Sequence, residues 1–117
     1  GTGIDGTTLA QLSFPESLAI DTNGYMYIAD RGNNRILQWR LGARSGICIV
    51  ACTGVPGLRT DQLDYPLGLA FDSNGSLYVS DDSNNRVQKF QVYTSAGEYL
   101  NNREDRLSLY FPQRTST

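Results

Sequence analysis

The sequence contains an internal duplication. Residues 11–46 align without a gap with residues 62–97, at an offset of 51 positions, and 14 of the 36 aligned pairs are identical. The match extends backwards, because residues 2–6 also fall on residues 53–57. A period near 50 residues is typical of propellers and other arrays, in which each copy is one supersecondary unit. Any fold for this chain must therefore build the same unit twice.

Each copy divides into four candidate strands separated by turn residues. The Asn-Gly pairs at 23–24 and 74–75 tolerate the positive φ angles of a type I′ turn, so we expect a hairpin at each pair. Polar loops separate the second and third strands. The predicted strands are residues 18–20, 25–29, 36–41 and 47–52 in the first copy, and 69–71, 76–80, 87–92 and, less clearly, 98–100 in the second.

Apolar side chains occupy both faces of the second predicted strand. Met26 and Ile28 point to one side, while Tyr25, Tyr27 and Ala29 point to the other. A sheet of this kind needs a cover on both faces, and the sequence lacks the helical crossovers of a parallel sheet. Four-stranded antiparallel blades packed face to face around an axis meet this need. We therefore predict an all-β chain of two β-propeller blades, with a sandwich or barrel as the alternative.

The composition narrows the chemistry open to the chain. Its 10 Lys and Arg and 12 Asp and Glu are interspersed and give a net charge of -2, which disfavours nucleic acid as a partner. Because the chain has no histidine, it cannot contain a Ser-His-Asp triad or a His-containing zinc site. No apolar stretch reaches the roughly 20 residues that span a bilayer, so we expect no membrane insertion.

The two cysteines lie four positions apart, in a segment that reads as one strand. On a strand, Cys48 and Cys52 would face the same side but lie roughly 13 Å apart at about 3.3 Å per residue, too far for a disulfide. We therefore expect two small buried residues with no bond between them.

Residues 15–36 and 66–87 resemble the NHL repeat. The Pro, Asp, Asn-Gly, Tyr, Asp, Asn and Arg positions recur in phase in both copies, which is far more specific than a single motif. The resemblance covers roughly residues 11–93. It implies a propeller, commonly six-bladed, that serves as a platform for protein or RNA partners and is attached to varied catalytic or signalling modules.

The duplication also divides the chain into segments. Residues 109–112 resemble the opening of a further copy, and because the chain begins with Gly1 we expect more sequence upstream. The predicted segments are an inter-blade loop at 1–10, a blade at 11–52, a second loop at 53–61, a second blade at 62–100, and a tail or the start of a third repeat at 101–117.

An acid and an arginine flank the loop after the second strand in both copies. Such a set could bind an anion, but a site usually breaks the symmetry between repeats, so we predict a structural role. The Asp would cap the loop and the Arg would tie down the next strand. Replacing either Asp with Ala should then cost a similar amount, on the order of 1 to 3 kcal/mol. The predicted structural residues are Asp30, Asn33, Arg35, Asp81, Asn84 and Arg86.

The predicted function is a non-catalytic scaffold that presents its loops to a macromolecule, with protein as the favoured partner. We expect no enzymatic activity and no cofactor. We expect no metal either, because the clustered acids do not match an EF-hand loop and turn chemistry explains them. The alternative is a fragment of a propeller enzyme, such as a calcium-dependent lactonase or a peptidyl-amidating lyase, whose site would gather ligands from several blades. The first strands, 18–20 and 69–71, carry no such ligands.

Loop positions that differ between the copies mark the predicted partner surface. The loop after the second strand and the loop entering the first strand should emerge on the same rim of a propeller, where variable residues can meet an asymmetric partner. The predicted contacts are Arg31, Leu58, Arg59 and Asp82.

Because two units leave sheet faces uncovered, we also expect the chain to self-associate or to need further blades.

Overall fold

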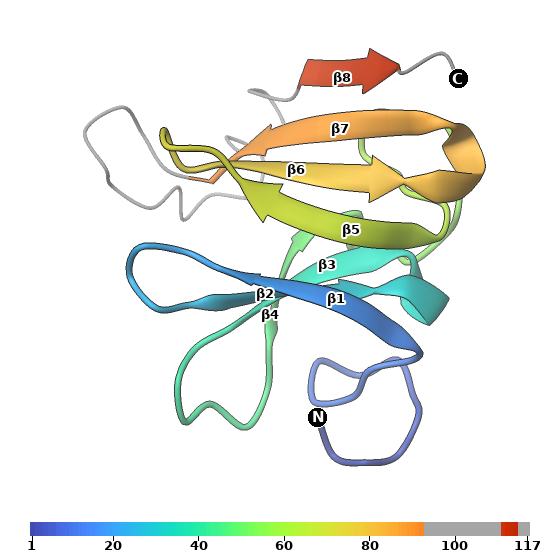
Figure 1. Cartoon of the computed structure of the whole chain (residues 1–117). Helices are drawn as coiled ribbons and strands as arrows, with labels where there is room; N and C mark the ends of the chain where they lie inside the picture. Colours follow the sequence, from blue (N-terminus) through green and yellow to red (C-terminus); the bar gives the residue numbers. More distant parts are fainter. Residues whose placement is uncertain (93–110, 115–117) are drawn as a thin grey trace.

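A computed structural model describes residues 1–92 and 111–114, and it confirms an all-β chain with two four-stranded antiparallel sheets. Each sheet is a meander whose strands pair in chain order (Figure 1). A short 3-10 turn, η1 (Arg31–Asn33) or η2 (Asp82–Asn84), joins the second and third strands of each sheet. The strands are β1 (Pro15–Ile20), β2 (Met26–Asp30), β3 (Arg35–Trp39) and β4 (Ile47–Val50), then β5 (Pro66–Phe71), β6 (Ser76–Asp81), β7 (Arg86–Gln91) and β8 (Phe111–Arg114).

The fourth strand of the second blade differs from the prediction. β8 pairs antiparallel with β7, so that residue 111 lies opposite Lys89 and residue 114 opposite Arg86. The segment that resembles the opening of a third repeat thus supplies the edge strand of the second blade. The strand predicted at 98–100 lies outside the described residues. Pairing depends on which segment reaches the free edge of β7, and similarity to another strand does not reveal this.

The hairpins form where the Asn-Gly pairs predict them, but the turn type differs. Gly24 and Gly75 have φ angles of 84° and 80°, while neither preceding Asn has a positive φ. A type I′ turn needs positive φ at both central residues. The cause is Asp21, whose Oδ1 accepts hydrogen bonds from the backbone N–H groups of Asn23 and Tyr25 at 2.9 and 3.0 Å. The second copy repeats this side-chain-stabilised turn.

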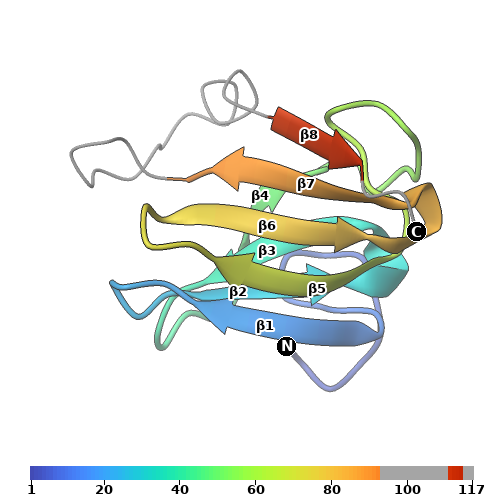
Figure 2. The ribbon, with the colours of Figure 1, turned by 45° about the horizontal axis from the view of Figure 1, so that its top comes forward.

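The hydrophobic core lies between the two sheets. β5 packs against β1 and β2, and the two meanders lie face to face (Figures 1 and 2). The rings of Tyr27 and Phe71 meet edge to face with centroids 4.8 Å apart, a geometry that aromatic pairs prefer. The buried members of the core are Tyr27, Ala29, Ile36, Ile49, Val50, Ala51, Leu63, Leu77, Val79, Phe90 and Val92. Consecutive propeller blades pack in this way.

Equivalent positions in the two blades show which sheet faces lack a cover. Val92, just after β7, is 0% exposed and belongs to the core, whereas Leu41 at the same repeat position is 99% exposed. Leu18 and Ile20 on β1 are 57% and 60% exposed, although their equivalents on β5 pack against the core. Among the described residues, the outer face of the first blade is therefore only partly covered: Leu18 and Ile20 are exposed, while Ile28 and Leu37 on the same face are buried.

Cys48 and Cys52 form a disulfide, so the prediction of two unbonded cysteines was wrong. Their Cα atoms lie only 5.7 Å apart. β4 ends at Val50, and Ala51 adopts a left-handed conformation with φ of 57°, which turns the chain back toward Cys48. The spacing of an extended strand therefore does not apply to this pair.

We expect neither cysteine to react with iodoacetamide until a reductant is added. Mass spectrometry of the urea-unfolded chain should show no adduct without dithiothreitol and two adducts with it. Replacing both cysteines with serine removes the constraint on a short loop of the unfolded chain and should lower the free energy of unfolding by about 2 kcal/mol. Adducts on the unreduced chain would show that the bond is absent.

Candidate functional site

A buried ion pair lies at one rim of each blade, where the loop entering the first strand meets the loop after the second strand. Arg35 Nε donates to Asp30 Oδ2 at 2.8 Å, and both residues are buried. Asp30 also accepts hydrogen bonds from the Ser13 backbone N–H at 2.7 Å and from Asn33 Nδ2 at 2.9 Å. The second blade repeats these contacts with Asp81, Arg86, Asp64 and Asn84.

The arginine of each pair clamps the inter-blade loop onto its blade. Arg35 donates through its two Nη atoms to the carbonyl oxygens of Thr7, Thr8 and Gln11, at 2.9, 2.8 and 3.2 Å. The equivalent acceptors for Arg86 are the carbonyl oxygens of Leu58, Arg59 and Gln62. Because the guanidinium groups are buried and bonded internally, they have little capacity left for a ligand.

The acid of the pair acts differently from the predicted loop cap. Asp30 makes no side-chain hydrogen bond to the N-terminus of η1, and Asp81 makes none to that of η2. Each carboxylate instead faces the incoming loop and the arginine. The backbone donor that it satisfies therefore comes from the segment that enters the first strand, Ser13 or Asp64, and the motif joins two loops instead of closing one.

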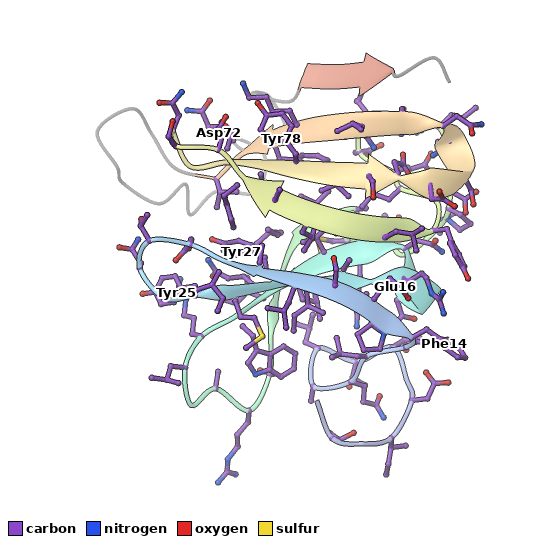
Figure 3. All side chains as sticks on the ribbon, in the orientation of Figure 1. Phe14, Glu16, Tyr25, Tyr27, Asp72 and Tyr78 are labelled. Atoms are coloured by element: carbon purple, nitrogen blue, oxygen red, sulfur yellow. A yellow bond between two sulfur atoms is a disulfide. The ribbon has the colours of Figure 1, made fainter. Side chains whose placement is uncertain are left out.

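Phe14, Arg31 and Tyr65 form an aromatic stack on the same rim. The Arg31 guanidinium carbon lies 5.3 Å from the Phe14 ring centroid and 4.6 Å from that of Tyr65. Its Nη1 atom is 3.4 Å from a Glu16 carboxylate oxygen. Phe14 and Tyr65 remain 66% and 40% exposed, and Figure 3 shows Phe14 and Glu16 at the start of β1. Our sequence reasoning selected Arg31 but missed both rings, although an aromatic residue precedes the proline in each copy.

The two ring-bearing residues have an unusual backbone conformation. Phe14 and Tyr65 have φ angles of 49° and 64°, a region that bulky residues rarely adopt. The conformation costs on the order of 1 to 3 kcal/mol, and a following proline favours an extended backbone instead. Both blades therefore keep a strained residue with an exposed ring at the same position. Strain of this kind clusters at binding sites, which makes the rim the leading candidate for one.

The remaining predicted contact residues lie on this rim as well. Leu58 is exposed, Arg59 pairs with Asp61 at 3.4 Å in solvent, and Asp82 is exposed at the start of η2. Backbone hydrogen bonds join the two loops of each blade. They run from Gly32 N to Ser13 O at 2.8 Å in the first blade, and from Ser83 N to Asp64 O at 3.1 Å in the second.

A small pocket of about 230 Å³ opens beside the rim of the first blade. Several of its polar groups are already engaged, since Asn33 Nδ2 donates to Gly6 O at 2.8 Å and to Asp30, and Arg35 makes four hydrogen bonds within the chain. Its lining residues are Thr7, Gly32, Asn33, Arg35, Cys52, Thr53 and Gly54.

Among residues 1–92 and 111–114, no three or more His, Cys, Asp or Glu side chains are grouped so as to hold a metal ion. In the same ranges, no helix is both long enough and apolar enough to cross a membrane.

At the opposite rim, hydrogen bonds hold the pKa of Asp72 below its ordinary value of 3.8. The largest cause is the backbone N–H of Ser76, supported by that of Asn74, by the Tyr78 hydroxyl and by the charge of Lys89, while burial opposes the shift. Asp72 and Tyr78 lie at one end of the second blade (Figure 3). The ionised carboxylate therefore stabilises the hairpin turn.

This shift predicts an acid-sensitive contribution to stability. Because the folded-state pKa of Asp72 lies below the unfolded-state value, the contribution is fully present above pH 3.8 and is lost as the pH falls through the folded-state pKa. We expect Asp72→Asn to lower stability at neutral pH and to flatten the fall in the urea midpoint between about pH 4 and pH 2. An unchanged acid limb in the variant would show that other groups dominate it.

Two antiparallel meanders that pack face to face, with their connecting loops clamped at one rim, define this chain as a β-propeller protein. The NHL repeat model matches residues 63–90, from buried Leu63 into β7. Human NHL repeat-containing protein 3 is 31% identical over 103 residues, and its mouse counterpart 32%, in each case over 84% of this chain. The chain belongs to the NHL-repeat family, and it spans 28% of the length of these relatives.

Proposed function

We propose that the chain is a non-catalytic part of an NHL-repeat propeller scaffold, and that its loop rim binds a protein partner. The main support for this proposal is that the rings of Phe14 and Tyr65 are exposed at the rim on a strained backbone. The rim loops also differ in sequence between the blades. The Asp-Arg pairs beneath are buried and bonded to groups within the chain, so we assign them to the fold. NHL repeats often mediate protein interactions, and further blades, commonly six in a ring, would complete the platform.

The proposed contacts are Arg31, Leu58, Arg59 and Asp82. A photoreactive benzoylphenylalanine at Leu58, in the protein expressed in its own cells, should give a discrete adduct after irradiation. The same probe at Asn74, on the opposite rim, should give none. Arg59→Glu should weaken binding of the cross-linked protein while moving the melting temperature by no more than about a degree or two, because rim charges contribute little to folding. An adduct formed only with the probe at Asn74 would place the partner on the opposite rim and contradict the proposal.

The proposal of a non-catalytic chain has its own test. Calcium titration should leave the melting temperature unchanged, because an ion stabilises only a fold that binds it. A large calcium-dependent rise, absent with magnesium, would instead favour the class of calcium-dependent propeller enzymes.

A further inference from the structure

The first blade shows how its rim seats a guanidinium group. Arg31, the first residue of η1, lies against the ring of Phe14 from its own blade and pairs with Glu16. Backbone hydrogen bonding of Gly32 to Ser13 holds the tip of η1 next to that ring. The ring, the cation and the carboxylate all come from one blade, so the arrangement should recur wherever the repeat supplies the same partners.

The second blade has the same frame without the cation. Tyr65 replaces Phe14, and Ser83 N bonds to Asp64 O as Gly32 N bonds to Ser13 O, so Asp82 holds the position of Arg31. Arg31 from the first blade covers one face of the Tyr65 ring, yet the ring is still 40% exposed, and Asp82 is exposed as well. A short carboxylate therefore stands where the first blade places a long cation.

We propose that Tyr65 and Asp82 form a seat for an arginine side chain of the protein partner, a proposal that rests on the rim function proposed above. A planar guanidinium can stack on the open part of the Tyr65 ring and pair with the Asp82 carboxylate at the same time. The nearby charges agree, because Arg31 is paired with Glu16 and Arg59 with Asp61, which leaves the charges of Asp64 and Asp82 to favour a cation. An anionic partner would meet repulsion at this point.

The test is a titration of the isotope-labelled chain with acetylated tri-arginine amide at low salt, followed by amide chemical shifts in NMR spectra. The shifts should concentrate at residues 64–65 and 82–85. Tyr65→Asn keeps a residue that tolerates positive φ but removes the ring, and it should weaken binding about threefold or more. Asp82→Arg supplies the cation from within the chain, as Arg31 does, and should weaken binding at least as much.

Tyr25→Asn is the matched control, because it removes a ring at the opposite rim, where Arg40 of the chain already lies 4.9 Å from the ring centroid, and it should leave tri-arginine binding unchanged. Shifts spread over all acidic residues, or equal binding by Tyr65→Asn, would overturn the seat. Larger shifts at these residues with acetylated tri-glutamate would do so too. If tri-arginine does not bind but the probe at Leu58 still gives a cross-linked adduct in cells, only the arginine seat is wrong. If tri-arginine binds but Leu58 gives no adduct in cells, the rim function is wrong.

Discussion

Replacing Asp81 with alanine should lower the free energy of unfolding by about 3 to 5 kcal/mol, and Asp30→Ala should have a similar effect. The structure raises the sequence-based figure because each acid is fully buried and its loss leaves a buried arginine without its carboxylate partner. Asp81 also accepts a hydrogen bond from Gln88 Nε2 at 3.0 Å. Urea denaturation followed by circular dichroism measures both changes, with a stabilising osmolyte added if a variant is unfolded in buffer.

Asp82→Ala is the matched control for Asp81→Ala, since the exposed neighbour should change stability by no more than about 0.5 kcal/mol. The equality of the Asp30 and Asp81 effects is the essential point, because both blades use the same clamp. If one of the two substitutions left stability unchanged but abolished partner binding, that copy of the motif would be part of a site.

The second large effect concerns assembly, and we expect the isolated chain to self-associate at micromolar concentration. In residues 1–92 and 111–114, the sheet faces that are only partly covered correspond to the two halves of the interface that already joins the blades. Leu18 and Ile20 correspond to residues of β5 that pack on the first blade, and half-buried Tyr78 corresponds to fully buried Tyr27. Copies can therefore stack head to tail, and such an interface closes into a ring or continues as a filament. Three copies would supply the blades of a six-bladed ring.

Sedimentation equilibrium provides the measurement for assembly. The wild-type mass should exceed the 12.9 kDa of one chain, and the variant with Leu18→Lys and Ile20→Lys should return to that value. Val55→Lys changes an equally exposed apolar residue on the rim, away from the sheet faces, and should assemble like the wild type. A stable, cooperatively folding wild-type monomer at these concentrations would refute the assembly.

Local patterns were enough to predict most of the fold. The second strands of both copies, the positions of the hairpins and the two-faced apolar sheets follow from alternation and from the Asn-Gly pairs. The fourth strand of the second blade could not be predicted in this way, because β8 lies far along the chain from β7 and carries no alternation that marks it as a partner.

The Cys48–Cys52 bond and the rim stack were missed for a related reason. Both depend on single residues with positive φ, namely Ala51, Phe14 and Tyr65, whose side chains give no local preference for that conformation. A proline after the aromatic residue even argues for an extended backbone. Tertiary contacts impose these angles, and such contacts cannot be read from a short stretch of sequence.

The proposed binding rim and the proposed assembly both depend on the face-to-face packing of the two blades. A double-mutant cycle on Tyr27 and Phe71 tests this packing most directly. The two rings belong to different blades and meet at 4.8 Å. Tyr27→Leu, Phe71→Leu and the double variant should reveal a coupling energy of about 0.5 to 1.5 kcal/mol in urea denaturation. If the two substitutions were additive within error, the rings would not be in contact and the blades would not pack as described.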